Sequence, residues 1–141
     1  MDKNLCIKAM TIEAYDEIYS IWCSIPGIGL SNADSRKSIE KYLERNPNMS
    51  FNCYDGDKIV GTILCGHDGR RGYIHHTCVL SEYRGKNIGK KLAEKALEGL
   101  KNEGIDKCHL FVFCDNDMGK SFWNIMGWKK RSDLLVYSME T

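Results

Sequence analysis

A long amphipathic helix between two apolar runs dominates the sequence. From Asn87 onward, apolar side chains as far as Leu100 recur on one helical face, and Gly104 stands where a C-terminal helix cap belongs. One apolar run precedes this helix in "GYIHHTCVL" (72–80), and another follows it in "KCHLFVFC" (107–114). The hydrophobic period thus changes from two residues to about 3.6 and back, which is typical of a mixed fold of strands and helices.

Two more helices are predicted before this unit. "NLCIKAM" (4–10) has the pattern of an opening strand, and Thr11 is an N-cap candidate for a helix that Pro26 ends. A weaker helix follows from about Asp34 and stops before Pro47, because the residue before a proline disfavours the helical conformation.

Three strand-like runs fill residues 49–80. They are separated by Asp55-Gly56 and by the region of Asp68-Gly69, which are turn signals between apolar segments. These residues therefore predict an antiparallel meander.

The C-terminal third is predicted to add three strands and one helix. Residues 107–114 have the pattern of a buried strand, and Asp115 or Asn116 can cap the last helix. Two more strands are predicted in "GWKKR" (127–131) and "LLVYSME" (134–140). The prediction is a single α/β (α+β) domain over residues 1–141, with about four helices and a mixed central sheet of about seven strands.

Composition excludes several classes of function. The 141 residues carry a net charge of only +1, so no long-range field directs the protein to nucleic acid or to an anionic membrane. No apolar run approaches the roughly 18 residues that a membrane-spanning helix needs. We therefore expect no nucleic-acid or membrane partner, and any anion site must be local.

The cysteines indicate a reducing compartment. There are seven, an odd number, and no signal peptide opens the chain, so a secreted disulfide framework is not expected. None of them forms a C-x-x-C pair, which argues against zinc. We expect a cytoplasmic protein without a metal site.

The start of the long helix has the features of an anion site. In "EYRGKNIGKKLAEKA" (82–96), two glycines and Asn87 lie near the start of the helix. Three lysines lie there too, where the helix dipole disfavours positive charge. A strand that leads through a glycine-bearing turn into a helix directs several unpaired backbone N–H groups at one point, where a phosphate can bind. The alternative is an ordinary turn followed by solvated lysines. The spacing fits neither G-x-x-x-x-G-K-[ST] nor G-x-G-x-x-G, so nucleotide hydrolysis and dinucleotide chemistry are not supported.

Two ordered motifs resemble those of the GNAT superfamily of N-acetyltransferases. "VLSEYRGKNIGKKLAEKAL" (79–97) resembles the acyl-CoA signature [QR]-x-x-G-x-[GA], with Arg84 and Gly89 at its ends. "NDMGKSFWNIMGW" (116–128) resembles the downstream pattern N-x-x-A-x-x-F-Y-x-x-x-G-F. The predicted element order agrees with that fold along the whole chain, and the nearest likeness is to uncharacterised bacterial members.

This resemblance implies an N-acetyltransferase that uses acetyl-CoA as its co-substrate. Its sheet is splayed between the fourth and fifth strands, so that an amine can attack the thioester directly in a ternary complex. The residues assigned to acetyl-CoA binding are Cys78, Val79, Leu80, Arg84, Gly85, Lys86, Asn87, Ile88, Gly89, Lys90, Asn116 and Trp123. The acceptor is predicted to be a small-molecule or peptide amine, and the protein a monomer or a homodimer.

Four positions depart from the family pattern. Asn87 replaces the central glycine of the first motif, and Gly119 replaces the usual alanine of the second. Trp123 stands where a tyrosine often protonates the leaving thiolate, and Phe111 where some relatives carry a glutamate. An indole cannot act as an acid near neutral pH. The alternative function is therefore a weak or inactive acyl-CoA-binding module.

Histidines on the strand before the long helix can replace the missing proton-transfer groups. His75 and His76 are the catalytic candidates, because an imidazole has a pKa near 6.5, and strand alternation points the two to opposite faces. The alternative is a pair of partly buried structural histidines. Tyr137 in the last strand is held in reserve as a hydroxyl donor. The aromatic residues of the first helix either border the acceptor pocket or belong to the core; they are Tyr15, Tyr19 and Trp22.

Overall fold

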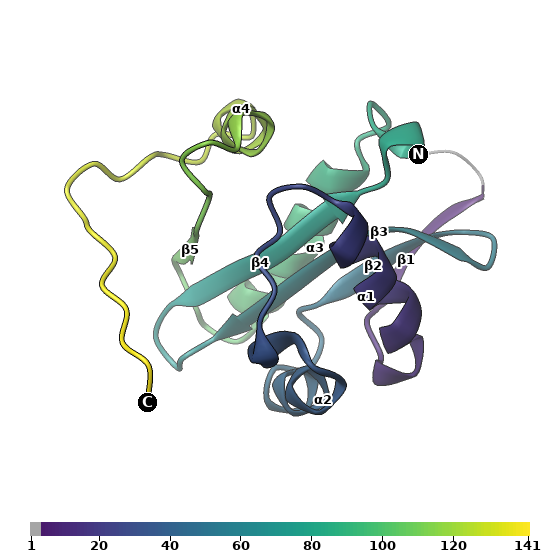
Figure 1. Cartoon of the computed structure of the whole chain (residues 1–141), viewed down its shortest axis with the longest axis horizontal. Coiled ribbons are helices and arrows are strands. Elements are labelled where there is room, and N and C mark those ends of the chain that lie inside the picture. Colours follow the sequence, from purple (N-terminus) through teal and green to yellow (C-terminus); the bar gives the residue numbers. More distant parts are fainter. Residues whose placement is uncertain (1–3) are drawn as a thin grey trace. The chain divides into compact units, whose positions relative to one another are not determined.

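The computed structural model describes residues 4–141, which fall into two compact units. The first unit ends at Phe111 and contains a five-stranded sheet, and the second begins at Val112. The strands are β1 (Leu5–Ala9), β2 (Phe51–Asp55), β3 (Lys58–His67), β4 (Gly72–Val79) and β5 (Cys108–Leu110). They lie in the sheet in sequence order (Figure 1).

The sheet is mixed, as the sequence predicts. The first four strands pair antiparallel with their neighbours through the two predicted turns, whereas β5 pairs parallel to β4. A parallel pair needs a crossover connection, and the long helix supplies it. This helix is α3 (Ile88–Asn102), and Gly104 follows it with φ of 79°, as expected of a glycine that ends a helix.

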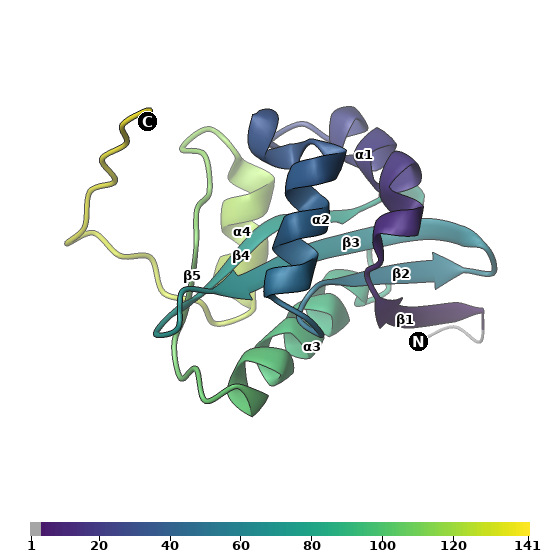
Figure 2. The same cartoon turned by 90° about the horizontal axis from the view of Figure 1, so that it is seen from below.

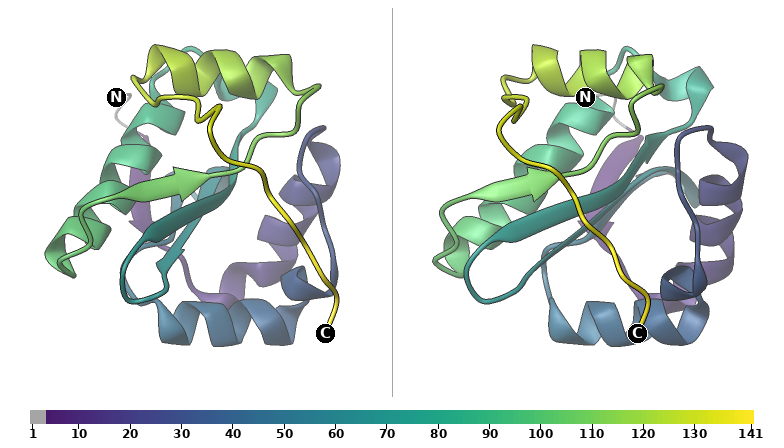
Figure 3. Two further views of the ribbon diagram at one scale, coloured as in Figure 1. Left: turned by 90° about the vertical axis from the view of Figure 1, so that its left-hand side faces the viewer. Right: turned by 60° about the vertical axis from the view of Figure 1, so that its left-hand side comes forward.

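Helices cover both faces of the sheet in the first unit. Figures 2 and 3 show α3 on one face, and α1 (Tyr15–Ser24) and α2 (Arg36–Arg45) on the other. Short 3-10 helices precede α1, α2 and α3 at Ile12–Ala14, Asn32–Asp34 and Ser81–Tyr83. The two N-terminal helices thus begin later than Thr11 and Asp34, the starts that the sequence predicts.

The predicted apolar face of α3 packs closely on the sheet. Its buried side chains, all at most 2% exposed, are Ile88, Leu92, Ala93, Ala96 and Leu100. The approach is close at Gly72, where an added Cβ would lie 2.4 Å from Cδ1 of Leu100. This close contact fixes the position of α3 against β4, the strand that carries the candidate histidines.

The second unit contains one helix and an extended segment. Helix α4 (Asp117–Ile125) begins after Asn116, which is one of the two predicted caps. Trp123 contacts the rings of Phe122 and Trp128, with centroid distances of 4.8 and 5.0 Å. Residues 128–141 form neither helix nor strand, and the yellow trace in Figure 1 shows their extended course.

Two strand predictions are therefore wrong. The described residues form five strands instead of about seven, because neither "GWKKR" nor "LLVYSME" has a backbone pairing partner within 4–141. The latter has three adjacent apolar residues but no alternation, and a strand needs a neighbour to bond its N–H and C=O groups. The predicted buried strand over residues 107–114 is also only partly correct. It shortens to β5, whose residues are half-buried at the edge of the sheet, and Phe111 beyond it is 64% exposed.

Candidate active site

β4 extends beyond the end of its pairing with β5. Ile74 is the last residue of β4 that pairs with β5, opposite Leu110, while β4 continues to Val79 (Figure 3). The outer edge of the following residues has no strand beside it within the described chain. The pairing of β4 with β5 therefore ends before His75, where β5 itself ends, and the splay between the fourth and fifth strands stays a prediction.

A β-bulge lies in β4 just after the last residue that pairs with β5. Thr62 pairs with Cys78 and Leu64 pairs with His75, so β4 carries one residue more than β3 between these pairs. His76 occupies the bulge with φ of 44°, a left-handed conformation that residues other than glycine, asparagine and aspartate adopt rarely. Such a bulge redirects the side chains and backbone groups around it.

The bulge turns both histidines to the same side of the sheet. The His75 ring lies 6.5 Å from that of Tyr42 in α2, and the His76 ring lies 4.8 Å from that of Trp22 in α1. Trp22 and Tyr42 belong to one hydrophobic cluster on the face that α1 and α2 cover. The prediction that alternation separates the two imidazoles is wrong, because the extra residue breaks the alternation.

A buried carboxylate holds His76. Nε2 of His76 lies 2.6 Å from Oδ1 of Asp34, whose side chain is 8% exposed. Oδ2 of Asp34 accepts a hydrogen bond from the backbone N–H of Ser31 at 3.0 Å. The hydroxyl of Tyr15 donates to the Asp34 carbonyl at 2.5 Å. The loop before α2 is thereby tied to the bulge of β4.

His75 has a different environment. No hydrogen-bond partner of its ring lies among residues 4–141, and its side chain is partly buried beside Tyr42. Burial lowers the pKa of His75 below its usual value, and the neighbouring His76 lowers it further. The imidazole of His75 is therefore neutral at pH 7.

The backbone at the start of α3 has the form that the sequence predicts for an anion site. Asn87 is left-handed with φ of 65°, and Gly85 has φ of 80°. The side chain of Asn87 does not cap the helix, and no acidic residue lies in its first turn. The first N–H groups of a helix have no partner inside it, and here they lie beside Lys90 and Lys91. This end of α3 therefore suits a phosphate group.

Hydrogen bonds hold the segment between the bulge and α3. Leu80 N–H bonds to the carbonyl of Val60, and the Nε of Arg84 donates to the carbonyl of Val79 at 3.3 Å. These contacts fix the course of residues 79–84 from the end of β4 to the helix. The hydroxyl of Thr77 is buried and has no partner among the described residues, which leaves a polar atom for a ligand to satisfy.

The cysteine of this segment is chemically inert. Cys78 is 3% exposed, and burial raises the pKa of its thiol to about 12. It is therefore protonated near neutral pH and is a poor nucleophile. The seven cysteines of the chain all have free thiols.

Three predicted site residues lie in the second unit. The side chain of Asn116 accepts a hydrogen bond from the backbone N–H of Gly119 at 3.0 Å, so its oxygen caps α4 while its amide NH₂ group remains a donor. Trp123 belongs to the aromatic group described above. Tyr137 is 90% exposed and lies outside any strand, contrary to the prediction.

The sequence interpretation missed Asp34 and the role of Tyr15. Ser31 and Asp34 form a capping box at the 3-10 helix before α2, so the local pattern S-x-x-D has a sufficient structural reason. Nothing in it signals a contact with a histidine 42 residues away. Trp22 and Tyr15 belong to the core cluster, and their outer neighbour Tyr19 packs against it.

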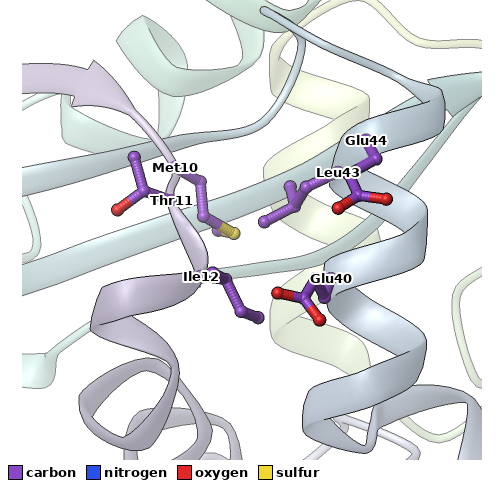
Figure 4. A pocket seen from close by; sticks show the side chains of 6 residues that line it. All are labelled: Met10, Thr11, Ile12, Glu40, Leu43 and Glu44. Carbon is purple, nitrogen blue, oxygen red and sulfur yellow. The ribbon is translucent and has the colours of Figure 1, made fainter.

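Other features of the described residues do not suggest a second centre. A pocket of about 190 Å³ lies between residues 10–12, which precede α1, and α2 (Figure 4), but none of the predicted site residues lines it. Within residues 4–141, no three His, Cys, Asp or Glu side chains gather as a metal ion requires. No helix in the same range is long and apolar enough to cross a bilayer.

Comparison with known proteins agrees with this geometry. The sequence model of the acetyltransferase (GNAT) family matches residues 15–128. N-alpha-acetyltransferase 30 of Schizosaccharomyces pombe is 29% identical over 120 residues, which cover 82% of this chain and 80% of that protein.

Solved structures share the fold. An acetyltransferase of the GNAT family from Staphylococcus aureus Mu50 has a TM-score of 0.80 and 23% identity, over 93% of this chain and 89% of its own. The NatC complex bound to Gag peptide and CoA has a TM-score of 0.76 and 23% identity, over 91% and 86%. The family match extends over most of the chain, and acetyl-CoA is the co-substrate that the family uses. The chain belongs to the GNAT family of acetyltransferases and is an acetyl-CoA-dependent N-acyltransferase.

Proposed function

We propose that this enzyme transfers the acetyl group of acetyl-CoA to the α-amino group of a peptide or small molecule. The amine attacks the thioester directly, in a ternary complex. The observation that carries the proposal is the end of β4–β5 pairing after Ile74, next to a helix whose N-cap residue, Asn87, makes no side-chain capping bond. An opening of this kind holds two reactants in line, which supplies most of the rate enhancement in such a transfer.

The donor is assigned to the backbone around the start of α3. The pyrophosphate binds to N–H groups between Arg84 and Lys90, and the pantetheine arm lies along Cys78, Val79 and Leu80. Asn116 and Trp123 complete the set that the family resemblance assigns. Fixed backbone dipoles need no reorganisation when charge develops, so N–H groups of the splayed strand can also polarise the thioester carbonyl.

Direct attack is favoured over an acyl-enzyme route through Cys78. Its thiol has a pKa of about 12, because the side chain is buried. The thiolate would be the nucleophile of an acyl-enzyme route, and it is absent near neutral pH. The acetyl group therefore passes to the amine without forming an acyl-enzyme intermediate on Cys78.

An imidazole is proposed to accept the amine proton. His75 and His76 both lie where β4 leaves β5, and both face α1 and α2. His75 is neutral at pH 7 because burial lowers its pKa, so it is able to accept a proton. A positioned base contributes about 10² to 10⁴ in rate.

An α-amino acceptor suits the absence of a glutamate at Phe111 and of a tyrosine at Trp123. An α-amino group has a pKa of roughly 7.7–8.0, so it is partly neutral already, whereas a lysine amine near 10.4 needs a stronger base. The name of the yeast relative, an N-alpha-acetyltransferase, points to the same class of acceptor.

The second candidate is an acyl-CoA-binding module that has lost catalysis. It is favoured by Trp123, which packs against two aromatic rings and offers no titratable hydroxyl. We further propose a cytoplasmic protein in which residues 1–141 act as one domain, as a monomer or a homodimer.

Transfer of label from radioactive acetyl-CoA distinguishes the two candidates. The acceptor panel contains short peptides with free N-termini, the same peptides with blocked N-termini and an internal lysine, and small amines. We expect a labelled product from the free N-termini only. Saturable acetyl-CoA binding without any product would favour the inactive module. Chromatography of the product avoids a thiol-release assay, which seven cysteines would disturb.

The lowered pKa of His75 also predicts how stability depends on pH. Between this pKa and the unfolded value of about 6.5, the unfolded chain binds more protons, so the free energy of unfolding decreases as pH falls through this range. His75→Ala removes this contribution and gives a shallower decrease. Thermal unfolding of both proteins from about pH 7.5 to about pH 5 tests this, because the reference pKa of histidine lies inside the range. Equal slopes would contradict the assignment.

A further inference from the structure

Asp34 is a buried carboxylate that the mechanism above does not use. The residue is 6% exposed, and both of its carboxylate oxygens have a partner: Nε2 of His76 and the backbone N–H of Ser31. The Tyr15 hydroxyl fixes its backbone carbonyl from α1. A residue whose carboxylate is held at two points and whose backbone carbonyl is held at a third can impose an orientation on the group that it contacts.

The contact determines which nitrogen of His76 is available. A carboxylate only accepts hydrogen bonds, so Nε2 carries a proton and Nδ1 of the neutral ring keeps its lone pair. Nδ1 has no hydrogen-bond partner among residues 4–141 and is not one of their buried unpaired polar atoms. Packing against the Trp22 ring at 4.8 Å fixes the ring plane.

The same arrangement does not exist at His75. Its ring has an edge contact with Tyr42 but no carboxylate partner among the described residues, and burial makes it a weaker base. The titratable groups around the Asp34–His76 pair are His75 and Cys78 on β4 and Tyr15 and Tyr19 on α1. None of them is a cation at neutral pH that could replace the charge of Asp34.

We propose that Asp34 is a positioning residue of the transfer reaction: it holds His76 in the Nε2–H tautomer, so that Nδ1 accepts the proton of the attacking amine. The inference rests on the proposed function. A bond forms between the amine nitrogen and the acetyl carbon, and the carbon–sulfur bond breaks with its electron pair remaining on sulfur. One proton passes from the amine nitrogen to Nδ1, and the CoA thiolate then takes up a proton from solvent or from the imidazolium. Asp34 stabilises this imidazolium, as a carboxylate does behind a catalytic histidine.

The first test observes the tautomer without any reaction. The chain has four histidines, so the ¹⁵N resonances of the imidazoles can be assigned with single substitutions. We expect the Nε2–H form for His76 in the wild-type protein and a mixture of tautomers in Asp34→Asn. An Nδ1–H form in the wild-type protein would overturn the inference.

The second test measures turnover. Asp34→Asn is expected to lower kcat by about tenfold or more, with unchanged acetyl-CoA affinity, within the roughly 10²–10⁴ that a positioned base contributes. Asp68→Asn is the matched control: its carboxylate accepts two backbone N–H bonds at 2.8 Å in an exposed turn, and its loss should leave kcat unchanged.

A double-mutant cycle separates positioning from simple destabilisation. His76→Asn removes the imidazole and keeps a residue that tolerates positive φ. Adding Asp34→Asn to His76→Asn should not lower kcat further, since Asp34 acts through His76. An active wild type whose kcat is unchanged by Asp34→Asn, or additive effects in the cycle, would overturn this inference alone. A wild type that acetylates no amine would overturn the proposed function and this role together.

Discussion

Two asparagines precede helices in this chain, and their side chains behave in opposite ways. Asn116 caps α4, with its side-chain oxygen 3.0 Å from the N–H of Gly119, and Asp117 follows in the first turn. Asn87 precedes α3 in a left-handed conformation, caps nothing, and is followed by Ile88, Gly89 and two lysines. One helix thus satisfies its own N-terminus, and the other leaves its N-terminus open.

The comparison shows what distinguishes a binding site from an ordinary helix end. Every helix has unpaired N–H groups and a positive dipole end, and both are normally met by a capping side chain or an acidic residue. Lysines at an open N-terminus are unfavourable unless an anion is bound there. These features support the proposal that the start of α3 binds a ligand, whereas the start of α4 is capped by its own side chain.

The largest effect is expected at the open N-terminus. Gly89→Glu places a carboxylate among the first N–H groups of α3, where it replaces and repels a phosphate. We expect acetyl-CoA binding to be abolished, as measured by isothermal titration calorimetry. Unchanged affinity would show that the pyrophosphate does not bind at this helix end.

A second variant separates loss of binding from loss of folding. This control is needed because Gly89 is buried and a buried carboxylate is destabilising. Lys90→Glu brings the same charge to an exposed position of the same turn. It should weaken acetyl-CoA binding by at least about tenfold, since one lost ion pair and one new repulsion together exceed about 1.4 kcal/mol. Thermal unfolding of both variants identifies any loss of structure.

The capped N-terminus is expected to respond in stability instead of affinity. Asn116→Ala removes the acceptor for the Gly119 N–H and should cost about 1 kcal/mol of local stability in α4. Amide hydrogen exchange at positions 118–120 measures this loss. Asn116→Ser, which keeps a capping oxygen, should restore most of the protection. Unaltered exchange in Asn116→Ala would remove the distinction between the two helix ends.

Local patterns in the sequence were sufficient for most of the fold. The period of α3, the turns at Gly56 and Gly69 and the cap at Asn116 each depend on residues a few positions apart, and each is present in the structure. The left-handed conformation of Asn87 also follows from its residue type and its place in the motif.

Features that depend on distant partners could not be predicted in the same way. The contact of Asp34 with His76 joins residues 42 positions apart, and the bulge that turns both histidines to one face has no signature in "GYIHHTCVL". The prediction of two C-terminal strands is wrong for a related reason. An apolar run such as "LLVYSME" shows what a strand would bury, but it does not supply the neighbour with which the strand must pair.

A smaller effect is expected from changing Asn87 itself. Asn87→Ala should cost about 1 kcal/mol of stability, because alanine lacks the local hydrogen bonding that makes left-handed geometry tolerable. Asn87→Gly adopts φ of 65° without strain and matches the family motif, so acetyl-CoA affinity should be retained or improved. Equilibrium unfolding and calorimetry on the pair measure the two effects. Loss of affinity in Asn87→Gly would instead indicate that the asparagine side chain contacts the ligand.

The smallest net effect is expected from Gly119→Ala, which opens the N-terminus of α4 without changing Asn116. A Cβ at this position would lie 2.6 Å from the Nδ2 of Asn116, so the capping side chain must move. The lost cap costs about 1 kcal/mol, and alanine regains a similar amount through its higher helix propensity, so overall stability should change by less than about 0.5 kcal/mol. Amide exchange still separates the two contributions: the N–H at position 119 should exchange faster, while that of Lys120, bonded to the Asn116 carbonyl at 3.0 Å, should remain protected. If both amides keep their wild-type protection, the asparagine can cap around a methyl group, and the glycine at this position has no part in closing this helix end.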